Sequence, residues 1–247
     1  MGTVEKYILK RIKDERTVHF ILIDPESSTP NMAANLSKEA EKAGSAAILV
    51  GGSTVTHPNK LDLIVKAIKR NVKVPVILFP GNVTGISKHA DAVLFMSLLN
   101  SSNPYFIVGA QTLGAPLIKK YGLEPISLGY IILGQGGVAG LVGYAHPMPY
   151  DRPELAAMYA LAAQYLGMHF VYLEAGSGAS EPIPPNVISQ VNKTIDIPLI
   201  VGGGIKKGTD AKKVADAGAS IIVTGNIIEE TAKVKNKITE IINKIKS

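Results

Sequence analysis

The sequence predicts an α/β protein that folds as a (β/α)8 barrel of the TIM type, formed as one domain by residues 1–247. Two observations lead to this fold class. Eight short apolar runs follow one another along the chain, and helical patterns separate most of them. Such an alternation within 247 residues is typical of this barrel. A doubly wound sheet is the alternative, but it would need fewer strands and a switch in strand order that nothing here indicates.

The predicted strands are nearly continuously apolar, which indicates parallel strands buried on both faces. They are expected at residues 18–26, 46–52, 74–81, 91–99, 125–133, 169–176, 197–204 and 219–226. Helical patterns occupy residues 31–44, 59–71, 104–122, 154–167, 209–219 and about 229 to the end. The first of these helices ends on Gly44, a suitable C-cap.

Two intervals depart from the regular alternation. Only residues 82–90 separate the third and fourth strands, which is too short for a full barrel helix, so the third helix is expected to be vestigial or replaced by a loop. Residues 134–153, after the fifth strand, are long and rich in Gly and Pro, whereas ordinary connections of this kind have about 2–6 residues. A long insertion at the catalytic end of a barrel is a candidate lid.

The composition narrows the class of function. The chain has no Cys, which excludes disulfides and thiolate chemistry and is compatible with a reducing compartment. The charged N-terminus does not resemble a signal peptide, and no apolar run reaches the roughly 18–20 residues of a membrane span, so a cytoplasmic protein is expected. The net charge is +6, but the lysines are dispersed and no basic patch with interleaved aromatics predicts nucleic-acid binding.

Three strands end on glycine-rich breaks, at 176–178, 202–204 and 225–226. In this barrel the loops after all strands gather on one face, and phosphate commonly binds after strands seven and eight. Glycines let backbone N–H groups approach an oxyanion closely. The three breaks therefore predict one site for a phosphate monoester, although each break alone would be compatible with a tight turn.

The opposite side of the barrel mouth carries Asp24, which ends the first strand, and Ser53 and Thr54, which end the second. One carboxylate and a hydroxyl form a poor metal cage on their own. They suit Mg²⁺, which keeps several waters and takes ligands from substrate phosphates. Asp24 could equally be a turn or N-cap residue.

Glu174 and Tyr172 lie two positions apart in the sixth strand, so both can point into the barrel mouth. A buried Glu without a partner is costly, and beside a phosphate site it is a natural general base. The five histidines are scattered and form no set with metal-ligand spacing.

The order of five motifs resembles the geranylgeranylglyceryl phosphate synthase family, which also includes heptaprenylglyceryl phosphate synthases. The motifs are LIDPE (22–26), LVGGST (49–54), VYLEAGSGA (171–179), VGGGIKKG (201–208) and IVTGN (222–226). The resemblance covers essentially the whole chain, and the block 111–133 is similar to the second of the family's two groups.

The resemblance implies a reaction in which the 3-hydroxyl of sn-glycerol 1-phosphate attacks C1 of a prenyl diphosphate, with geranylgeranyl diphosphate expected, and diphosphate leaves. It implies Mg²⁺ at Asp24 and Ser53 and proton removal by Glu174, with Tyr172 beside it. The glycerol phosphate would lie against Tyr172, Leu173, Glu174, Ala175, Gly176, Ser177, Gly178, Gly203, Gly204, Gly225 and Asn226. This would be the first ether-bond step of phospholipid synthesis. A homo-oligomer and peripheral membrane contact for product release are also expected.

The prenyl tail requires an apolar trench, which the missing third helix would open. Candidate lining residues are Phe79, Phe95, Leu98, Leu99, Tyr105 and Phe106. Two other functions stay open: another phosphate-binding barrel enzyme, which usually needs a second acid–base residue or a Schiff-base lysine, and a non-catalytic barrel that binds phospholipid or polyanions. The sixth strand has no lysine, which argues against the first, and the presence of Asp24, Ser53 and Glu174 together argues against the second.

Overall fold

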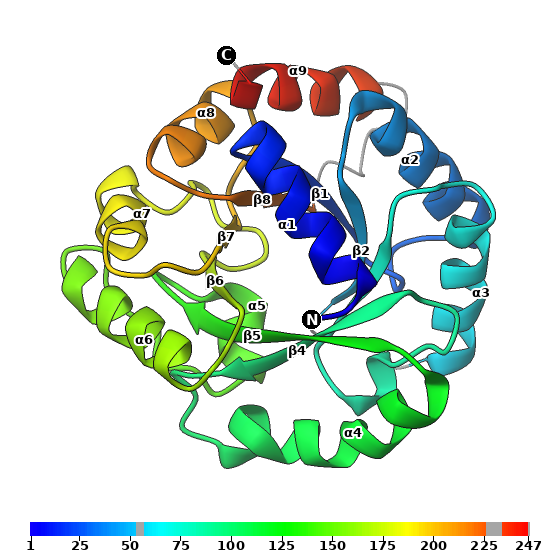
Figure 1. Ribbon diagram of the computed structural model, residues 1–247, viewed down its shortest axis with the longest axis horizontal. Helices are drawn as coiled ribbons and strands as arrows, with labels where there is room; N and C mark the ends of the chain where they lie inside the picture. Colours follow the sequence, from blue (N-terminus) through cyan, green and yellow to red (C-terminus); the bar gives the residue numbers. More distant parts are fainter. Residues whose placement is uncertain (53–56, 226–233, 247) are drawn as a thin grey trace.

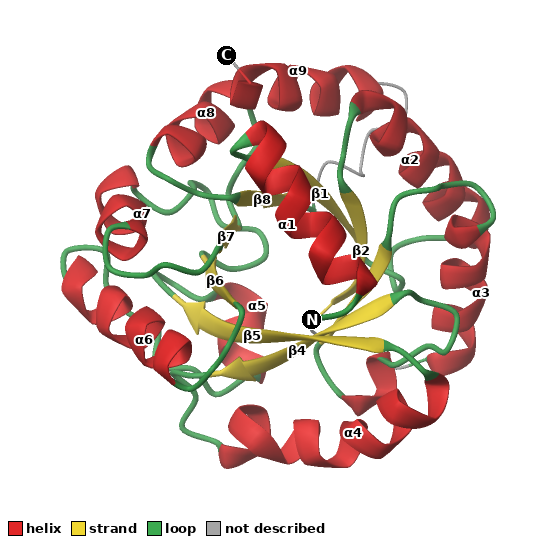
Figure 2. Ribbon diagram, viewed as in Figure 1, coloured by secondary structure: helices red, strands yellow, loops and turns green. Residues whose placement is uncertain are grey.

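The computed structural model describes residues 1–52, 57–225 and 234–246. Eight parallel strands close into a barrel in the order of the chain, with helices around the outside (Figures 1 and 2), so the predicted fold class is confirmed. The strands are β1 (Val18–Ile23), β2 (Ala47–Gly52), β3 (Val76–Pro80), β4 (Ala92–Leu98), β5 (Glu124–Ile132), β6 (Phe170–Glu174), β7 (Leu199–Gly202) and β8 (Ile221–Thr224).

The helices are α1 (Thr3–Glu15), α2 (Pro30–Ala43), α3 (Pro58–Lys69), α4 (Ala110–Tyr121), α5 (Gly137–Val142), α6 (Pro153–Tyr165), α7 (Pro185–Asn192), α8 (Gly208–Asp216) and α9 (Val234–Lys246). Before α4 lies a π-helical turn, η2 (Tyr105–Gly109). Gly44 ends α2 with φ +108°, as expected for a left-handed C-cap. The sequence patterns did not predict α7, and the expected start of the last helix near residue 229 lies outside the described residues.

The helix that would follow the third strand, between β3 and β4, is reduced to one short 3₁₀ turn, η1 (Val83–Gly85), as the sequence predicted. The wall of the barrel is also open at this point. Strands β3 and β4 pair from Ile77↔Ala92 to Leu78↔Val93, whereas β4 and β5 stay paired as far as Leu98↔Tyr130. The carboxyl ends of β3 and β4 therefore separate, and helix α4 lies outside the gap.

Residues 134–153 are not a plain loop, because they contain α5. The glycines of this segment have a structural use in the observed conformation. A Cβ at Gly136 would lie 2.9 Å from Pro147, and one at Gly176 would lie 2.7 Å from the backbone of Gly136 and Gly137. The segment is therefore packed against the loop that follows β6.

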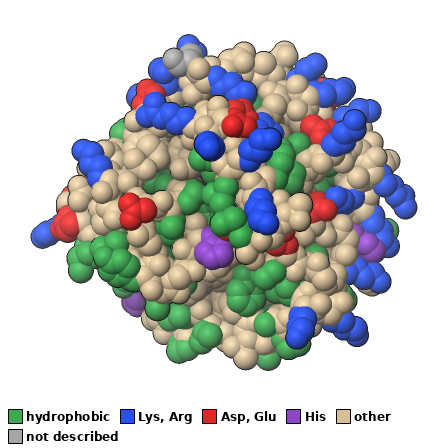
Figure 3. All heavy atoms as spheres, in the orientation of Figure 1, with side chains coloured by type: hydrophobic (Ala, Val, Ile, Leu, Met, Phe, Trp, Pro, Cys, Tyr) green, Lys and Arg blue, Asp and Glu red, His purple; other side chains and the backbone are tan. Residues whose placement is uncertain are grey.

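The N-terminal helix α1 covers the end of the barrel opposite the carboxyl ends of the strands (Figure 1). Val4 and Ile8 belong to the same apolar cluster as the inward-facing strand residues Val18 and Phe20. The carboxylate of Glu124 accepts hydrogen bonds at 2.8 Å from the first-turn amides of Val4 and Glu5, which caps the helix. On this face Lys and Arg are spread around the rim among acidic side chains (Figure 3), so the face carries no continuous basic patch.

Candidate active site

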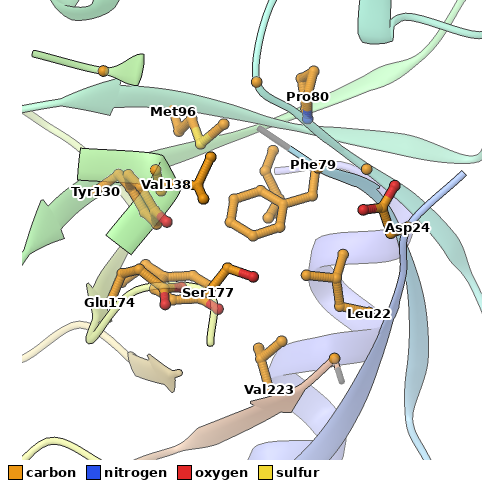
Figure 4. Close-up of a pocket in the computed structure, with 18 of the residues that line it drawn as sticks. Leu22, Asp24, Phe79, Pro80, Met96, Tyr130, Val138, Glu174, Ser177 and Val223 are labelled. Atoms are coloured by element: carbon orange, nitrogen blue, oxygen red, sulfur yellow. The ribbon is translucent and has the colours of Figure 1, made fainter. Parts of the chain in front are cut away.

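A cavity of about 840 Å³ opens at the carboxyl ends of the barrel strands. This volume lies within the usual range of small-molecule sites, about 300–1,000 Å³. Asp24 lies on one side of the cavity and Glu174 on the other, and the ring of Phe79 projects between them (Figure 4). The site therefore offers two acidic groups that face each other across the barrel mouth.

Glu174 ends β6 and is 7% exposed, with its side chain directed into the cavity as the strand alternation predicted. Its Oε1 accepts a hydrogen bond of 2.7 Å from the backbone N–H of Gly176. The hydroxyls of Tyr172 and Tyr130 also donate to the carboxylate. Burial raises the pKa of Glu174, while these three hydrogen bonds act in the opposite direction. The result is a partnered carboxylate that is more basic than an ordinary surface Glu.

Tyr130 is a site residue that the sequence reasoning missed. It lies in β5 next to Tyr172 in β6, and their rings pack edge to face with centroids 5.1 Å apart. Burial, together with the nearby charge of Glu174, raises the pKa of both tyrosines well above the usual value, so both hydroxyls stay protonated. The available signal was the strand alternation of β5, which places Tyr130 on the inward face.

The three glycines at the end of β7 are required first by the protein itself. A Cβ at Gly202 would lie 2.0 Å from the hydroxyl of Tyr172, and one at Gly203 would lie 2.6 Å from Oε1 of Glu174. A Cβ at Gly204 would lie 2.0 Å from the carbonyl oxygen of Glu181. The run thus leaves room for the two site side chains, and Gly203 and Gly204 also have positive φ angles of 84° and 71°.

Several of the predicted phosphate-binding residues do gather in the cavity. Its lining includes Gly176, Ser177, Gly178, Gly203, Gly204 and Gly225. The three glycine breaks therefore contribute to one cavity rather than three separate turns. Leu173 and Ala175, from the same motif, do not line it: both are buried in the apolar cluster between the strands and the outer helices. Asn226 lies outside the described residues.

Asp24 lines the cavity at the end of β1. It also stabilises the turn that follows the strand, which was the alternative interpretation of this residue. Its Oδ1 accepts a hydrogen bond of 2.8 Å from the amide of Glu26, whereas Oδ2 has no hydrogen-bond partner among the described residues. Gly52 of β2 leaves space for this carboxylate, because a Cβ there would lie 3.2 Å from Oδ1. Ser53 and Thr54 lie outside the described residues.

No group of three or more His, Asp or Glu side chains with metal-site geometry is present in the part of the chain that the structure describes. A metal at Asp24 would therefore need most of its ligands from water and substrate, which is the coordination that Mg²⁺ prefers. Oδ2 of Asp24, which accepts no hydrogen bond from the described residues, fits that requirement.

The cavity continues between β3 and β4, through the gap in the barrel wall. There it is lined by side chains from both faces of β4, from η2 and from the outer helix α4, and by Ile86. The residues are Val93, Leu94, Phe95, Met96 and Leu98 of β4, Phe106 of η2, and Gly114 and Ile118 of α4. Of the trench residues expected from the sequence, Phe79, Phe95, Leu98 and Phe106 line this extension, and Leu99 and Tyr105 do not. An apolar branch thus leads away from the polar mouth.

Comparison with known proteins agrees with this arrangement. Residues 10–245 match the model of the PcrB family. The chain is 52% identical, over 98% of its length and 94% of the relative's, to a geranylgeranylglyceryl phosphate synthase from Thermofilum pendens. It superposes with a TM-score of 0.95 on the wild-type enzyme from Thermoplasma volcanium, at 44% identity, covering 100% of this chain and 98% of the other.

It superposes equally well, with a TM-score of 0.95, on (S)-3-O-geranylgeranylglyceryl phosphate synthase from Thermoplasma acidophilum, whose crystal structure holds the substrate sn-glycerol-1-phosphate. The identity is 41%, and the alignment covers 100% of this chain and 99% of that one. The resemblance carried by the five motifs is confirmed, and the chain belongs to the PcrB family.

Proposed function

We propose that this protein is a geranylgeranylglyceryl phosphate synthase, a prenyltransferase that joins sn-glycerol 1-phosphate to geranylgeranyl diphosphate. One observation carries the proposal: a buried, hydrogen-bonded Glu174 lies where a glycine-lined polar pocket meets an apolar branch of the same cavity. Such a junction suits a reaction between a small phosphorylated alcohol and a long apolar chain. The names of the relatives favour the same pair of substrates.

In the proposed reaction the oxygen of the 3-hydroxyl forms a bond to C1 of the prenyl chain. The bond between C1 and the diphosphate oxygen breaks, the diphosphate leaves with that electron pair, and the hydroxyl proton passes to Glu174. The prenyl carbon is allylic, so ionisation can run ahead of attack and the base can accept the proton late. The hydrogen bonds from Tyr130, Tyr172 and Gly176 hold the carboxylate of Glu174 in place for this transfer.

We propose Mg²⁺ as the cofactor, with the carboxylate of Asp24 as one ligand and Ser53 as the second. When bound, the ion would neutralise charge on the diphosphate leaving group. Asp24 lies across the cavity from Glu174, so the diphosphate and the glycerol phosphate would bind on opposite sides of the mouth. The phosphate of glycerol phosphate would then lie among Gly176, Ser177, Gly178, Gly203, Gly204, Gly225 and Asn226.

The length of the prenyl chain distinguishes this function from its alternative, a heptaprenylglyceryl phosphate synthase. The cavity of about 840 Å³ has to hold the diphosphate and the glycerol phosphate as well as the tail. We propose the geranylgeranyl chain because the relatives are named for it, and the assay below compares the two lengths directly.

Product formation tests the proposal directly. The protein is incubated with sn-glycerol 1-phosphate and prenyl diphosphates of increasing length, with Mg²⁺ or with excess chelator, and the ether product is measured by mass spectrometry. We expect most product from the geranylgeranyl compound and almost none with chelator. If none of the prenyl diphosphates gives product although glycerol phosphate binds, the result would favour the non-catalytic phosphate-binding barrel.

Two further properties belong to this proposal. Residues 134–153 are proposed to act as a lid, in which case their hydrogen exchange slows when both substrates are bound.

Val138, Leu141, Val142 and Tyr144 are exposed beside the cavity, and Val138 and Val142 also line it. This apolar rim is where an amphiphilic product would meet a membrane surface. Within the described residues, no helix is long and apolar enough to span a bilayer, and the cytoplasmic location stays a prediction.

A further inference from the structure

The charged side chains that line the cavity fall into two pairs. Among the described residues they are the carboxylates Asp24 and Glu174 and the ammonium groups Lys206 and Lys237. The proposed reaction uses both carboxylates and neither lysine. We propose that Lys206 and Lys237 form a cation pair that binds the phosphate of sn-glycerol 1-phosphate, an inference that takes its substrate from the proposed function.

The two lysines come from the segments that follow the two strands ending in glycine. Lys206 lies two residues beyond Gly204, between β7 and α8. Lys237 lies in α9, the helix after β8 and Gly225. Both therefore follow strands whose glycine-rich ends line the cavity, although they are 31 positions apart and only Lys206 belongs to a recognisable motif.

Neither ammonium group is within 4 Å of a carboxylate in the part of the chain that the structure describes, whereas other lysines of α9 are paired. Lys235 lies 4.0 Å from a carboxylate oxygen of Glu39, and Lys246 lies 2.8 Å from one of Glu15. Lys206 and Lys237 are both exposed at the cavity rim, so their charges are hydrated and available to an incoming anion.

The charge of the substrates explains the need for such a pair. A phosphate monoester carries about −1.5 to −2 charges at neutral pH, and it would enter a cavity that already holds two carboxylates. Backbone N–H groups of the glycine loops supply only partial positive charge. Flexible ammonium groups bind phosphate as point charges and also attract it from a distance. Their contribution is to the affinity for glycerol phosphate and not to the chemical step.

The test replaces each lysine with Met, which keeps the length of the side chain and removes its charge. Lys207→Met and Lys235→Met are matched controls from the same loop and the same helix, because neither residue lines the cavity. The Michaelis constants of both substrates and kcat are measured, and the affinity for inorganic phosphate is measured by calorimetry without prenyl diphosphate.

We expect Lys206→Met and Lys237→Met each to raise KM for sn-glycerol 1-phosphate about tenfold, the usual scale for losing one charge-assisted contact. Inorganic phosphate should bind correspondingly more weakly. KM for the prenyl diphosphate and kcat should stay within about twofold of the unsubstituted protein, as should every constant of the two controls. Lys237→Arg should restore most of the affinity, because it restores the charge.

Phosphate affinity and KM for glycerol phosphate that match the controls would overturn the inference, as would equal losses for both substrates. The two proposals fail separately. If the unsubstituted protein forms no ether product but binds phosphate through the lysines, the proposed function is wrong and the cation pair stands. If it forms product and the Met variants bind phosphate normally, the cation pair is wrong alone.

Discussion

Glu174 is a buried carboxylate with hydrogen-bond donors from three residues. Three donors, from Gly176, Tyr130 and Tyr172, converge on it, and Gly203 lacks a side chain that would lie 2.6 Å from its Oε1. A base with this many partners is fixed in orientation, while its burial keeps it more basic than a surface carboxylate. Its position is thus favourable for proton transfer and unfavourable for stability whenever it is charged.

Glu174→Gln should lower kcat by about 10²- to 10⁴-fold, the usual contribution of general base catalysis, or about 3–5.5 kcal/mol in the barrier. KM for glycerol phosphate should change only a few-fold, because Gln keeps the size of the side chain. Steady-state kinetics separates the two constants. Tyr172→Phe is the milder comparison and should cost about 0.5–1.5 kcal/mol, since it removes one hydrogen bond. A near-normal kcat for Glu174→Gln would assign proton removal to water or another group.

The raised pKa of Glu174 also predicts how activity and stability vary with pH. Only the carboxylate can accept a proton, so kcat/KM, which reports the free protein, should fall as the pH falls through this raised pKa. Folding stability should run the other way: between the unfolded and folded pKa values the folded state binds more protons, so stability declines as pH rises. Thermal unfolding of Glu174→Gln should lack that decline. A variant that unfolds well below the unsubstituted protein at neutral pH would contradict this.

Asp24→Asn should retain the fold and lose about 100-fold or more in activity, because one oxygen ligand and one negative charge at the proposed Mg²⁺ site are removed. Asn can still accept the hydrogen bond from the Glu26 amide, which Oδ1 accepts in the native turn. Circular dichroism and a Mg²⁺ titration of the rate make the comparison. Full activity of the unsubstituted protein in excess chelator would remove the metal from the proposal.

At the scale of elements, the loops after β7 and β8 have different tolerances although both end in glycine. Gly204 has φ +71°, and its Cβ would lie 2.0 Å from the backbone oxygen of Glu181. Gly225 lines the cavity, and its Cβ would make an ordinary contact of 3.6 Å with Leu22. A side chain at Gly204 therefore meets the protein, while one at Gly225 meets the cavity.

Gly225→Val should raise KM for glycerol phosphate strongly, with little change for the prenyl diphosphate and little loss of stability. Gly204→Val should instead destabilise the fold by about 2–4 kcal/mol, because a left-handed conformation and a backbone clash both oppose the side chain. Substrate kinetics and thermal unfolding of the two variants separate these effects. Equal effects of Gly225→Val on both substrates would mean that the two anionic sites are placed wrongly.

The apolar branch depends on the absence of a full helix between β3 and β4 and on the early separation of these two strands. Gly114 of α4 lines this branch, and a Cβ there would lie 3.2 Å from Cδ1 of Ile86, the flexible end of a side chain. Gly114→Phe should therefore block the branch without unfolding the protein. We expect KM to rise for geranylgeranyl diphosphate and to change little for a ten-carbon analogue. If both respond alike, the tail binds elsewhere.

At the scale of the whole molecule, α6 is apolar on both sides. Its inner face buries Ala156, Ala157, Ala160 and Ala163, and its outer face exposes Leu155, Met158, Tyr159, Tyr165 and, at the C-cap, Leu166. A helix that is apolar all round is normally buried, and a contiguous exposed apolar surface marks an interaction site. This outer face is where we expect the homo-oligomer to form.

Tyr165→Glu with Leu166→Glu should shift the protein toward the monomer, because like charges brought together in an apolar interface repel and lose their hydration. Light scattering coupled to size exclusion measures the mass of both proteins over a range of concentrations. Both residues are strongly exposed, at 78% and 71%, so the fold of the protomer should be unaffected. An unsubstituted protein that is monomeric at high concentration would end the proposal.

The sequence by itself determined the barrel, the reduced helix between β3 and β4, and the gathering of Asp24, Glu174 and the glycine-rich strand ends at one cavity. Strand and helix periodicity depend on residues that are close along the chain, and Asp24 and Glu174 occupy strand ends, which a barrel brings to one face. Alternation along β6 likewise placed Tyr172 and Glu174 toward the cavity. The same motif led us to expect Leu173 and Ala175 at the glycerol phosphate, but both point into the apolar cluster outside the barrel.

Only the tertiary structure decided which atoms meet across strands. The hydrogen bond from Tyr130 to Glu174, the contact of Gly204 with Glu181 and the convergence of Lys206 with Lys237 on one cavity all join residues from different elements. The same holds for the apolar branch, which exists because β3 and β4 stop pairing at Leu78↔Val93. Such contacts depend on the register and packing of the closed barrel, and no local pattern of residues encodes that geometry.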